Sequence, residues 1–186
     1  MVRTGGKREK LMEAAKVLIH RQGLAQTTLA DIAGESGVPL GNVYYYFKTK
    51  DEIASAVIEE YRRHVAETLR SLDQSEGDPK KRLVWFIKSL ATEKEEVADH
   101  GCPVGSLCQE LNKDVTELAE KADDIFAAEI KWASAQFKLI GRKDAADAAV
   151  QLVATLQGIS LLGNAMKSPA VIGRQVALLC DWVDRM

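Results

Sequence analysis

Cysteine is scarce in this sequence, and long uninterrupted apolar runs are missing. The 186 residues include three cysteines and no C-x-x-C pair, so a disulfide scaffold and a structural metal site are both disfavoured, and reduced thiols are expected. The chain does not open with a charged leader and an apolar stretch, and no apolar run approaches the roughly 18–20 residues that a membrane span needs. We therefore expect a cytoplasmic protein that does not enter a membrane.

Residue sets that would mark an enzyme are also missing. The sequence shows no paired acid and base, no metal-ligand set and no phosphate-binding loop, which predicts a protein with neither catalytic activity nor a cofactor. We find no convincing strand, repeat or low-complexity segment. Hydrophobic residues make up 46% of the chain and charged residues 28%, so a soluble globular protein with a packed core is expected.

Charge is distributed unevenly along the chain. Residues 1–50 contain 8 Lys and Arg against 4 Asp and Glu, a net charge of +4, whereas residues 51–186 contain 17 against 23, a net charge of −6. The N-terminal part therefore favours contact with phosphate. Charge alone is weak support for nucleic-acid binding, because charged helix faces are usually only solvated.

Apolar residues recur at helical spacing through most of the chain, which predicts an all-α fold of about nine helices. The expected helices span residues 7–22, 29–36, 39–46, 49–72, 79–90, a short segment after 102, 115–140, 145–166 and 169–183. Gly23, Gly37 and Gly141 mark helix ends, and Thr28 is placed to accept a capping hydrogen bond from the backbone of Asp31. Two domains are expected, a three-helix unit over residues 1–50 and a larger helical domain over residues 51–186.

The segment from Thr27 to Lys50, TTLADIAGESGVPLGNVYYYFKTK, meets several requirements of a DNA-binding motif. Two short helices meet at a glycine turn, apolar residues lock them together, and polar and aromatic groups remain free. The apolar residues are Leu29, Ile32, Ala33, Val38, Val43 and Phe47. This arrangement is typical of a helix-turn-helix, whose second helix enters the major groove.

This segment resembles the TetR family of regulators, whose motif is T-x-x-x-I-A, then G-V, then a short helix that ends in Y-Y-x-F-x-x-K. The matching residues are Thr28, Ile32-Ala33, Gly37-Val38, Tyr44-Tyr45-Tyr46-Phe47 and Lys50. The match covers roughly the first 60 residues, and beyond them the resemblance is one of helix number and length. It implies a homodimeric, ligand-responsive repressor that an inducer releases from a palindromic operator in double-stranded DNA.

The resemblance implies that Thr28 and Lys50 contact phosphates and that the helix from Pro39 to Tyr46 enters the major groove. The chemistry agrees, because a hydroxyl at a helix start and a lysine near the next helix start offer donors to phosphate oxygens. The complete set of expected DNA-contacting residues is Thr28, Pro39, Leu40, Gly41, Asn42, Tyr44, Tyr45, Lys48 and Lys50.

Three consecutive tyrosines cannot all enter a small three-helix core. We expect Tyr45 to face outward first and Tyr44 second, with a core position for Tyr44 as an open alternative. Asn42 is the one side chain on this helix suited to a bidentate contact with adenine, worth about 1–3 kcal/mol of discrimination, and a purely solvated position is the alternative for it. Thr28 has a second interpretation as a helix cap alone.

Residues near the start of the same helix offer less to a base edge. Leu40 and Pro39 provide only apolar contact, for example to a thymine methyl group, and Gly41 permits a close approach of the backbone. The operator sequence therefore does not follow from these residues.

The larger domain contains two helices, over residues 145–183, that are apolar around much of their circumference. Such helices bury more than one side, and with the resemblance this predicts a homodimer in which the last two helices pair with their two-fold mates. The side chains available to line a cavity for an unknown small-molecule inducer are Trp85, Phe86, Phe126, Trp132, Phe137 and Met166. Ordinary core packing is the simpler alternative for each of them.

The segment from His100 to Leu111, HGCPVGSLCQEL, is similar to a G-C-x-x-G-x-L segment of a TetR subgroup that includes electrophile- and oxidant-responsive members. Cys102 precedes a helix start beside His100, and both features would lower the pKa of its thiol and suit a redox or electrophile sensor in the ligand site. Cys108 would be the residue to resolve an oxidised Cys102. The alternative is that Cys102, like Cys108 and Cys180, is a small buried hydrophobic residue.

Two other functions stay open at this stage. Cys102 with His100 would suit a thiol-dependent enzyme, although no further catalytic group accompanies them. A ligand-binding or scaffolding dimer that has lost DNA binding is the second, and the retained Thr28, Tyr45 and Lys50 disfavour it.

Overall fold

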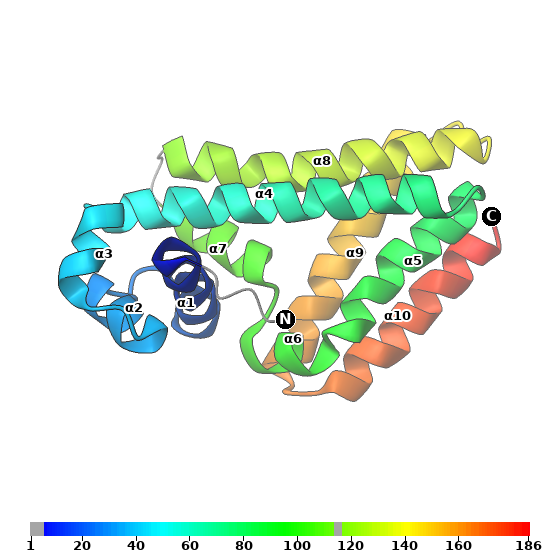
Figure 1. Cartoon of the computed structure of the whole chain (residues 1–186). Coiled ribbons are helices and arrows are strands. Elements are labelled where there is room, and N and C mark those ends of the chain that lie inside the picture. Colours follow the sequence, from blue (N-terminus) through cyan, green and yellow to red (C-terminus); the bar gives the residue numbers. More distant parts are fainter. Residues whose placement is uncertain (1–5, 114–116) are drawn as a thin grey trace.

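The computed structural model describes residues 6–113 and 117–186, which fold into ten helices without a strand (Figure 1). The helices are α1 (Lys7–Gln22), α2 (Leu29–Ser36), α3 (Leu40–Tyr46), α4 (Lys50–Ser75), α5 (Pro79–Thr92), α6 (Lys94–His100), α7 (Pro103–Leu111), α8 (Glu117–Leu139), α9 (Ala145–Ala165) and α10 (Pro169–Asp184). The expected all-α class, with a helix-turn-helix followed by a larger helical part, is confirmed. The predicted start of the long helix at Val115 lies outside the described residues.

Helix α6 is the one element that the apolar pattern did not separate from its neighbour. Glu93 leaves the helical conformation between α5 and α6 (φ −108°, ψ 17°), and Gly101 ends α6 with a positive φ of 84°. The break turns α6 toward α9, against which it packs. The described residues therefore contain ten helices, where the apolar pattern predicted about nine.

Helices α1–α3 form a three-helix head at one end of the molecule. Gly37 adopts the left-handed conformation (φ 65°) that makes the sharp turn from α2 to α3, which glycine reaches without a steric penalty. Val43 and Phe47 are buried at and just after α3. Because they pin one side of α3 to α1 and α2, the opposite side faces solvent.

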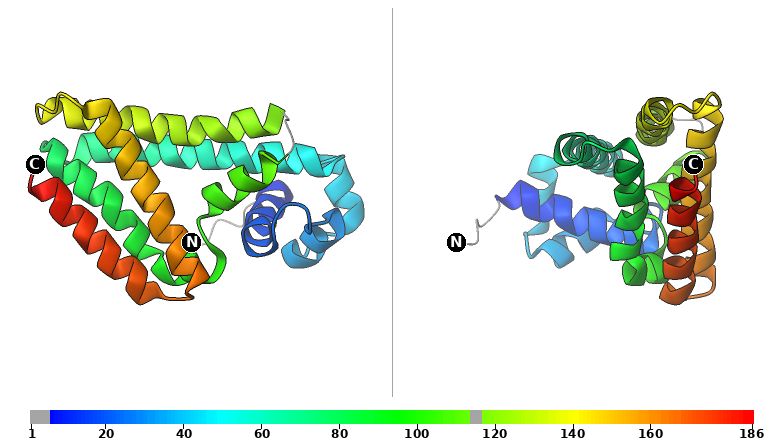
Figure 2. Two further views of the ribbon diagram at one scale, coloured as in Figure 1. Left: turned by 180° about the vertical axis from the view of Figure 1, so that it is seen from behind. Right: turned by 90° about the vertical axis from the view of Figure 1, so that its right-hand side faces the viewer.

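Two long helices connect the head to the rest of the molecule. α4 has 26 residues and is therefore about 39 Å long. α4 and α8 run side by side from the head to the far end, where α5, α9 and α10 pack together (Figures 1 and 2). α4 is thus a continuous helix that links the head to the far end of the molecule.

A polar network lies at the far end of α4. The Asp73 carboxylate on α4 accepts hydrogen bonds from Trp132 Nε1 (3.0 Å) and Gln136 Nε2 (3.2 Å) on α8. Arg82 of α5 donates to Gln136 Oε1 (3.1 Å) and lies 3.7 Å from Asp73. These contacts join α4, α5 and α8 at the end of α4 distant from the head.

The buried apolar residues form two separate cores. The first contains the inner residues of α1–α3, the first turns of α4, and parts of α7 and α8; the second contains residues of α5, α6, α9 and α10 and the second half of α8. The first core runs across the division expected at residues 50 and 51. A displacement of α7 or α8 relative to α4 would therefore also displace the helices of the head that share this core.

Helix α9 is long and apolar enough to cross a membrane by length and composition, which corrects the expectation that no segment meets that test. In the fold, its inner side, including Leu152 and Leu156, is buried, and α9 packs against α8 and α10. Its outer side exposes Val150, Leu161 and Leu162. The core helix of a soluble protein passes the same test.

Candidate nucleic-acid interface and its link to the larger domain

The outward side of α3 presents tyrosines and a glycine to solvent. Tyr45 is 81% exposed and Tyr44 is 52% exposed, which confirms that both face outward and rules out a core position for Tyr44. Gly41 lies one turn before Tyr45, and nothing stands within 4 Å of where its Cβ would be. This side of α3 has the shape and the groups that a helix needs to enter a groove of DNA.

Residues flanking this surface are less accessible or less polar. Asn42 is half-buried at the edge of the outward side, while Pro39 and Leu40 are exposed before it. Lys48 is exposed just after α3, and its backbone N–H donates to Glu52 Oε2 (2.8 Å). Its side chain is therefore an exposed cation two residues after the end of α3.

Thr28 forms a reciprocal cap with Asp31 at the start of α2. Its hydroxyl accepts from the Asp31 backbone N–H (3.1 Å) and donates to Asp31 Oδ2 (2.7 Å). These hydrogen bonds hold the pKa of the Asp31 carboxyl below its usual value. The expected capping role is confirmed, and the hydroxyl proton is already used within the protein.

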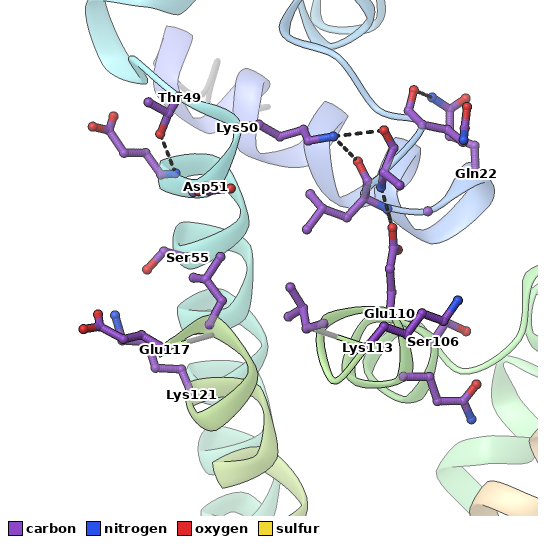
Figure 3. Close-up of a pocket in the computed structure, with 18 residues that line it drawn as sticks. Gln22, Thr49, Lys50, Asp51, Ser55, Ser106, Glu110, Lys113, Glu117 and Lys121 are labelled. Atoms are coloured by element: carbon purple, nitrogen blue, oxygen red, sulfur yellow. Dashed lines mark hydrogen bonds between the residues drawn. The ribbon is translucent and has the colours of Figure 1, made fainter. Parts of the chain in front are cut away.

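Lys50 and Glu110 hold the turn between α1 and α2 from two sides (Figure 3). The Lys50 ammonium on α4 donates to the backbone carbonyls of Leu24 and Ala25, both at 2.9 Å. The Glu110 carboxylate on α7 accepts from the backbone N–H of Leu24 (2.7 Å) and from that of Ala25. We call these four residues the turn clamp. It connects the head directly to α4 and α7.

A second contact joins the head to the larger part near the other end of α7. His20 of α1 is hydrogen-bonded through Nε2 to the Gly101 carbonyl (2.8 Å), so that nitrogen is the donor. Asn164, at the end of α9, donates to the Ala98 carbonyl in α6 (3.0 Å). The junction of α6 and α7 is thus held between α1 and α9.

A cleft of about 940 Å³ opens beside the turn clamp, between the α1–α2 turn and the neighbouring ends of α4, α7 and α8 (Figure 3). Its rim mixes lysines with carboxylates, including Lys50, Lys113, Asp51 and Glu110. It therefore favours no single charge of ligand. Among the described residues, no group of three or more His, Cys, Asp or Glu is placed to hold a metal ion.

Comparison with known proteins places the fold and the head in one family. The model of bacterial regulatory proteins, tetR family, matches residues 11–57. An uncharacterized HTH-type transcriptional regulator in the lacX 3' region of Lactococcus lactis subsp. lactis is 31% identical over 163 residues, which cover 83% of this chain and 82% of that protein. The HTH-type transcriptional regulator LmrA of Bacillus subtilis (strain 168) is 30% identical over 132 residues, 70% of this chain and 69% of its own.

The chain belongs to the TetR family of bacterial regulatory proteins. A crystal structure of a TetR transcriptional regulator from Legionella pneumophila has the same fold, with a TM-score of 0.86 at 17% identity over 96% of this chain and 97% of that chain. This TetR-family protein is therefore a DNA-binding transcription regulator and not an enzyme, which removes the thiol-enzyme alternative.

The expected ligand-lining side chains of this TetR protein lie in different surroundings. Trp85 and Met166 are 59% and 61% exposed, and Phe137 is fully buried against Trp182. Phe86 and Trp132 pack on each other, with 5.3 Å between ring centroids. None of the six lines the cleft beside the turn clamp. Helical spacing alone did not show which aromatic residues face the core and which face solvent.

Cys102 is the N-cap of α7, and its thiol is not activated. The sulfur accepts a hydrogen bond from the Gly105 backbone N–H (3.3 Å), but burial has the larger effect and raises the pKa of the thiol. This corrects the expectation of a lowered pKa. The His100 ring packs edge-on against His20, with 5.6 Å between ring centroids. Burial also raises the pKa of Cys108 to about 12.

Two carboxylates that the sequence reading missed have defined positions in the structure. Glu110 belongs to the turn clamp, and no sequence pattern connects it to a turn 85 residues away. Glu129 lies on the buried side of α8, between buried Ile125 and Ala133 at helical spacing. A carboxylate that interrupts the apolar stripe of an amphipathic helix is a pattern that would have identified Glu129.

Proposed function

We propose that the protein is a homodimeric repressor that binds a palindromic operator through α3 and is released by a small-molecule inducer held in the larger domain. The observation that carries this proposal is the two-sided character of α3. Val43 and Phe47 are buried, while Gly41 and Tyr45 are free on the opposite side. A helix presented in this way is the recognition element of a helix-turn-helix.

The proposal gives each residue that is expected to contact phosphate a defined role. Tyr44 and Tyr45 offer hydroxyls to the phosphate backbone, and Lys48 adds a free ammonium. The Lys50 ammonium has one N–H left after its two bonds to backbone carbonyls, so it reaches one phosphate oxygen while it holds the turn. Thr28 contacts phosphate only if its hydroxyl leaves Asp31.

A few groups at the start of α3 would contact the edges of the DNA bases. Asn42 reads a base at the edge of the helix, beside Gly41, which lets the backbone approach the groove. Pro39 and Leu40 add apolar contact with the groove. In this proposal, Asn42 provides the sequence specificity, and the tyrosines and lysines provide most of the affinity.

The second copy would dock on the outer sides of α9 and α10, which lie side by side on one face of the molecule (Figure 2). These sides expose Val150, Leu161, Leu162, Met166 and Leu178. Their contiguity on two adjacent helices suits a four-helix bundle formed with the two-fold mate. The two copies of α3 would then reach successive major grooves, about 34–36 Å apart. As a soluble DNA-binding protein, the dimer would act in the cytoplasm.

Helix α7 supplies the route from inducer to DNA in this proposal. Its nine residues span about 13 Å, with Cys102 at the inner end and Glu110 near the outer end. A ligand that shifts α7 moves the Glu110 carboxylate, and with it the α1–α2 turn. The contacts of Asp73 hold the far end of α4 in place. The displacement of α7 therefore changes the position of the head. An inducer that binds the shifted pose more tightly than the DNA-binding pose lowers operator affinity. The loss in the free energy of operator binding equals at most the difference between the inducer's two binding free energies.

A mobility-shift assay with DNA from upstream of the coding region tests the proposal. Tyr45→Ala should weaken specific binding about tenfold or more, equivalent to about 1.4 kcal/mol, and Asn42→Ala should reduce discrimination between operator variants. Trp85→Ala is the matched control, since it removes an exposed aromatic side chain far from the head. Equal specific binding by all four proteins would reject α3 as the recognition helix. The absence of any specific binding would favour the scaffolding alternative.

An electrophile as inducer is a second form of the proposal, supported by the position of Cys102 as the N-cap of the helix that carries Glu110. Addition of the Cys102 S–H across the carbon–carbon double bond of N-ethylmaleimide would form a thioether and place the thiol proton on the neighbouring ring carbon. The added ring would weaken the hydrogen bond from the Gly105 N–H and displace the start of α7. Cys102→Ser should then blunt the release of DNA by N-ethylmaleimide, with Cys180→Ser as the control. An unchanged response would reject this form and leave the small-molecule form in place.

A further inference from the structure

A polar seam lies between the two apolar cores of the larger domain. Along α8, the buried residues of the first core reach Ile125, with Phe126 packed against it. Those of the second core begin at Ala133, with Ile130 packed against it. Glu129 lies between them on the same buried side of the helix and belongs to neither core. A charged side chain therefore occupies a position where the helical spacing calls for an apolar one.

Other polar groups of the seam come from the helices that pack against α8. The Gln157 side chain of α9 lies beside the Cys102 thiol at the start of α7. A Cβ at Gly105 would stand 2.5 Å from Gln157 Oε1 and 3.5 Å from Cys102 Sγ, so the glycine makes room for both groups. The thiols of Cys102 and Cys108 are close enough to Glu129 for its charge to raise both of their pKa values further, after burial.

Glu129 has no partner of its own within residues 6–113 and 117–186. Its carboxylate takes part in no hydrogen bond or ion pair there, and burial alone raises its pKa to about 7. Every fully sealed side-chain oxygen or nitrogen in these residues does have a hydrogen-bond partner. The Glu129 oxygens are therefore not completely sealed, and the side chain as a whole is half-buried.

Among the described residues, no group around the seam supplies a positive charge. Cys102 and Cys108 of α7 stay as thiols because their pKa values are raised, and burial likewise raises the pKa of Tyr61 on α4. α9 contributes the neutral Gln157. Arg82, the cation that α5 directs toward α8, is committed to Gln136 and Asp73. Within residues 6–113 and 117–186, no cation is therefore placed to pair with the Glu129 carboxylate.

We propose that Glu129 is the charge-recognising residue of the inducer site and that the inducer is an organic cation, an ammonium group carried on an apolar or aromatic body. The inference rests on the proposed function, which supplies the inducer. Phe126, one turn before Glu129, offers an aromatic face to the same ligand, and Gln157 offers a neutral hydrogen-bonding group. Binding beside Cys102 places the ligand at the inner end of α7, where it moves the helix that carries Glu110.

The test uses a matched pair of probes, 4-phenylbutylammonium and 4-phenylbutan-1-ol, titrated calorimetrically into the full-length protein without DNA. The ammonium should bind the wild type at least about tenfold more tightly than the alcohol, which corresponds to about 1.4 kcal/mol. Glu129→Gln should remove most of that preference and leave the affinity for the alcohol unchanged. Glu120→Gln, an exposed position on the same helix, should behave as the wild type.

A second readout separates recognition of charge from a merely structural role. At pH 7, a cation that pairs with Glu129 drives a proton from the carboxyl group, so the heat of binding should depend on the ionisation enthalpy of the buffer in the wild type and not in Glu129→Gln. Equal affinities for the two probes, a preference that survives in Glu129→Gln, or no saturable binding of the ammonium at millimolar concentration would each overturn the inference. Operator binding is measured separately, so a failure here leaves the repressor proposal intact.

Discussion

Replacing Glu129 by glutamine should make the protein more stable, and increasingly so as the pH rises. Glutamine keeps the size and shape of the side chain but carries no charge. In the folded protein, burial raises the pKa of Glu129 from its ordinary value of 4.5 to about 7. Between these two values the folded state holds a proton that the unfolded state has lost, so the stability of the wild type falls as the pH rises through this window.

The size of the effect follows from the two pKa values. At pH 8 the charged carboxylate should cost about 3 kcal/mol relative to strongly acidic solution, and at pH 5 less than about 1 kcal/mol, because one pKa unit is worth about 1.4 kcal/mol. The stability gained by Glu129→Gln should therefore be about 2 to 3 kcal/mol larger at pH 8 than at pH 5. Any constant difference between a glutamine and a neutral carboxyl group cancels in this comparison.

Urea unfolding followed by far-ultraviolet circular dichroism at pH 5 and pH 8 measures this difference. The protomer concentration has to be equal in all samples, because a dimer gains stability with concentration. Glu120→Gln on the exposed side of α8 is the control and should show the pH dependence of the wild type. If Glu129→Gln and the wild type differ by the same amount at both pH values, the carboxylate is not held in a desolvated, unpartnered position.

Two further substitutions test the packing of α9 against α10 and the link to the head. A Cβ on Gly163 would stand 2.3 Å from Ile172 Cγ1, so Gly163→Ala should lower the unfolding free energy by about 1–3 kcal/mol, whereas Gly34→Ala, in open space on α2, should raise it slightly. Glu110→Gln should leave one backbone N–H of the turn clamp without an acceptor, which lowers stability by about 1 kcal/mol and weakens operator binding several-fold. Operator binding unchanged by Glu110→Gln would show that the clamp does not position the head.

Much of the fold could be predicted because local rules decided it. Thr28, Gly37 and Gly141 are a helix cap and two turn residues whose positions follow from backbone chemistry, and the helices end where they indicate. The outward position of Tyr45 followed from the small volume of a three-helix core. The break at Glu93 was missed because no proline or glycine marks it.

The interior of the larger domain could not be predicted in the same way. Which side of a helix meets which neighbour depends on contacts between residues far apart in the chain, so Trp85 and Met166 were expected in a cavity and are exposed. The pKa of Cys102 was expected to fall because of its place before a helix, but burial, which sequence does not show, has the larger effect. Glu129 is the exception, since its position in an apolar stripe is visible in the sequence.

A footprint of the protein on the DNA upstream of its coding region tests the central claim most directly. The account predicts two protected half-sites on one side of the duplex, centred one helical turn apart, about 34–36 Å. Tyr45→Ala should remove protection of both half-sites, and Trp85→Ala should remove neither. Protection of a single site, or two protected sites that persist in Tyr45→Ala, would contradict a dimer that reads its operator through α3.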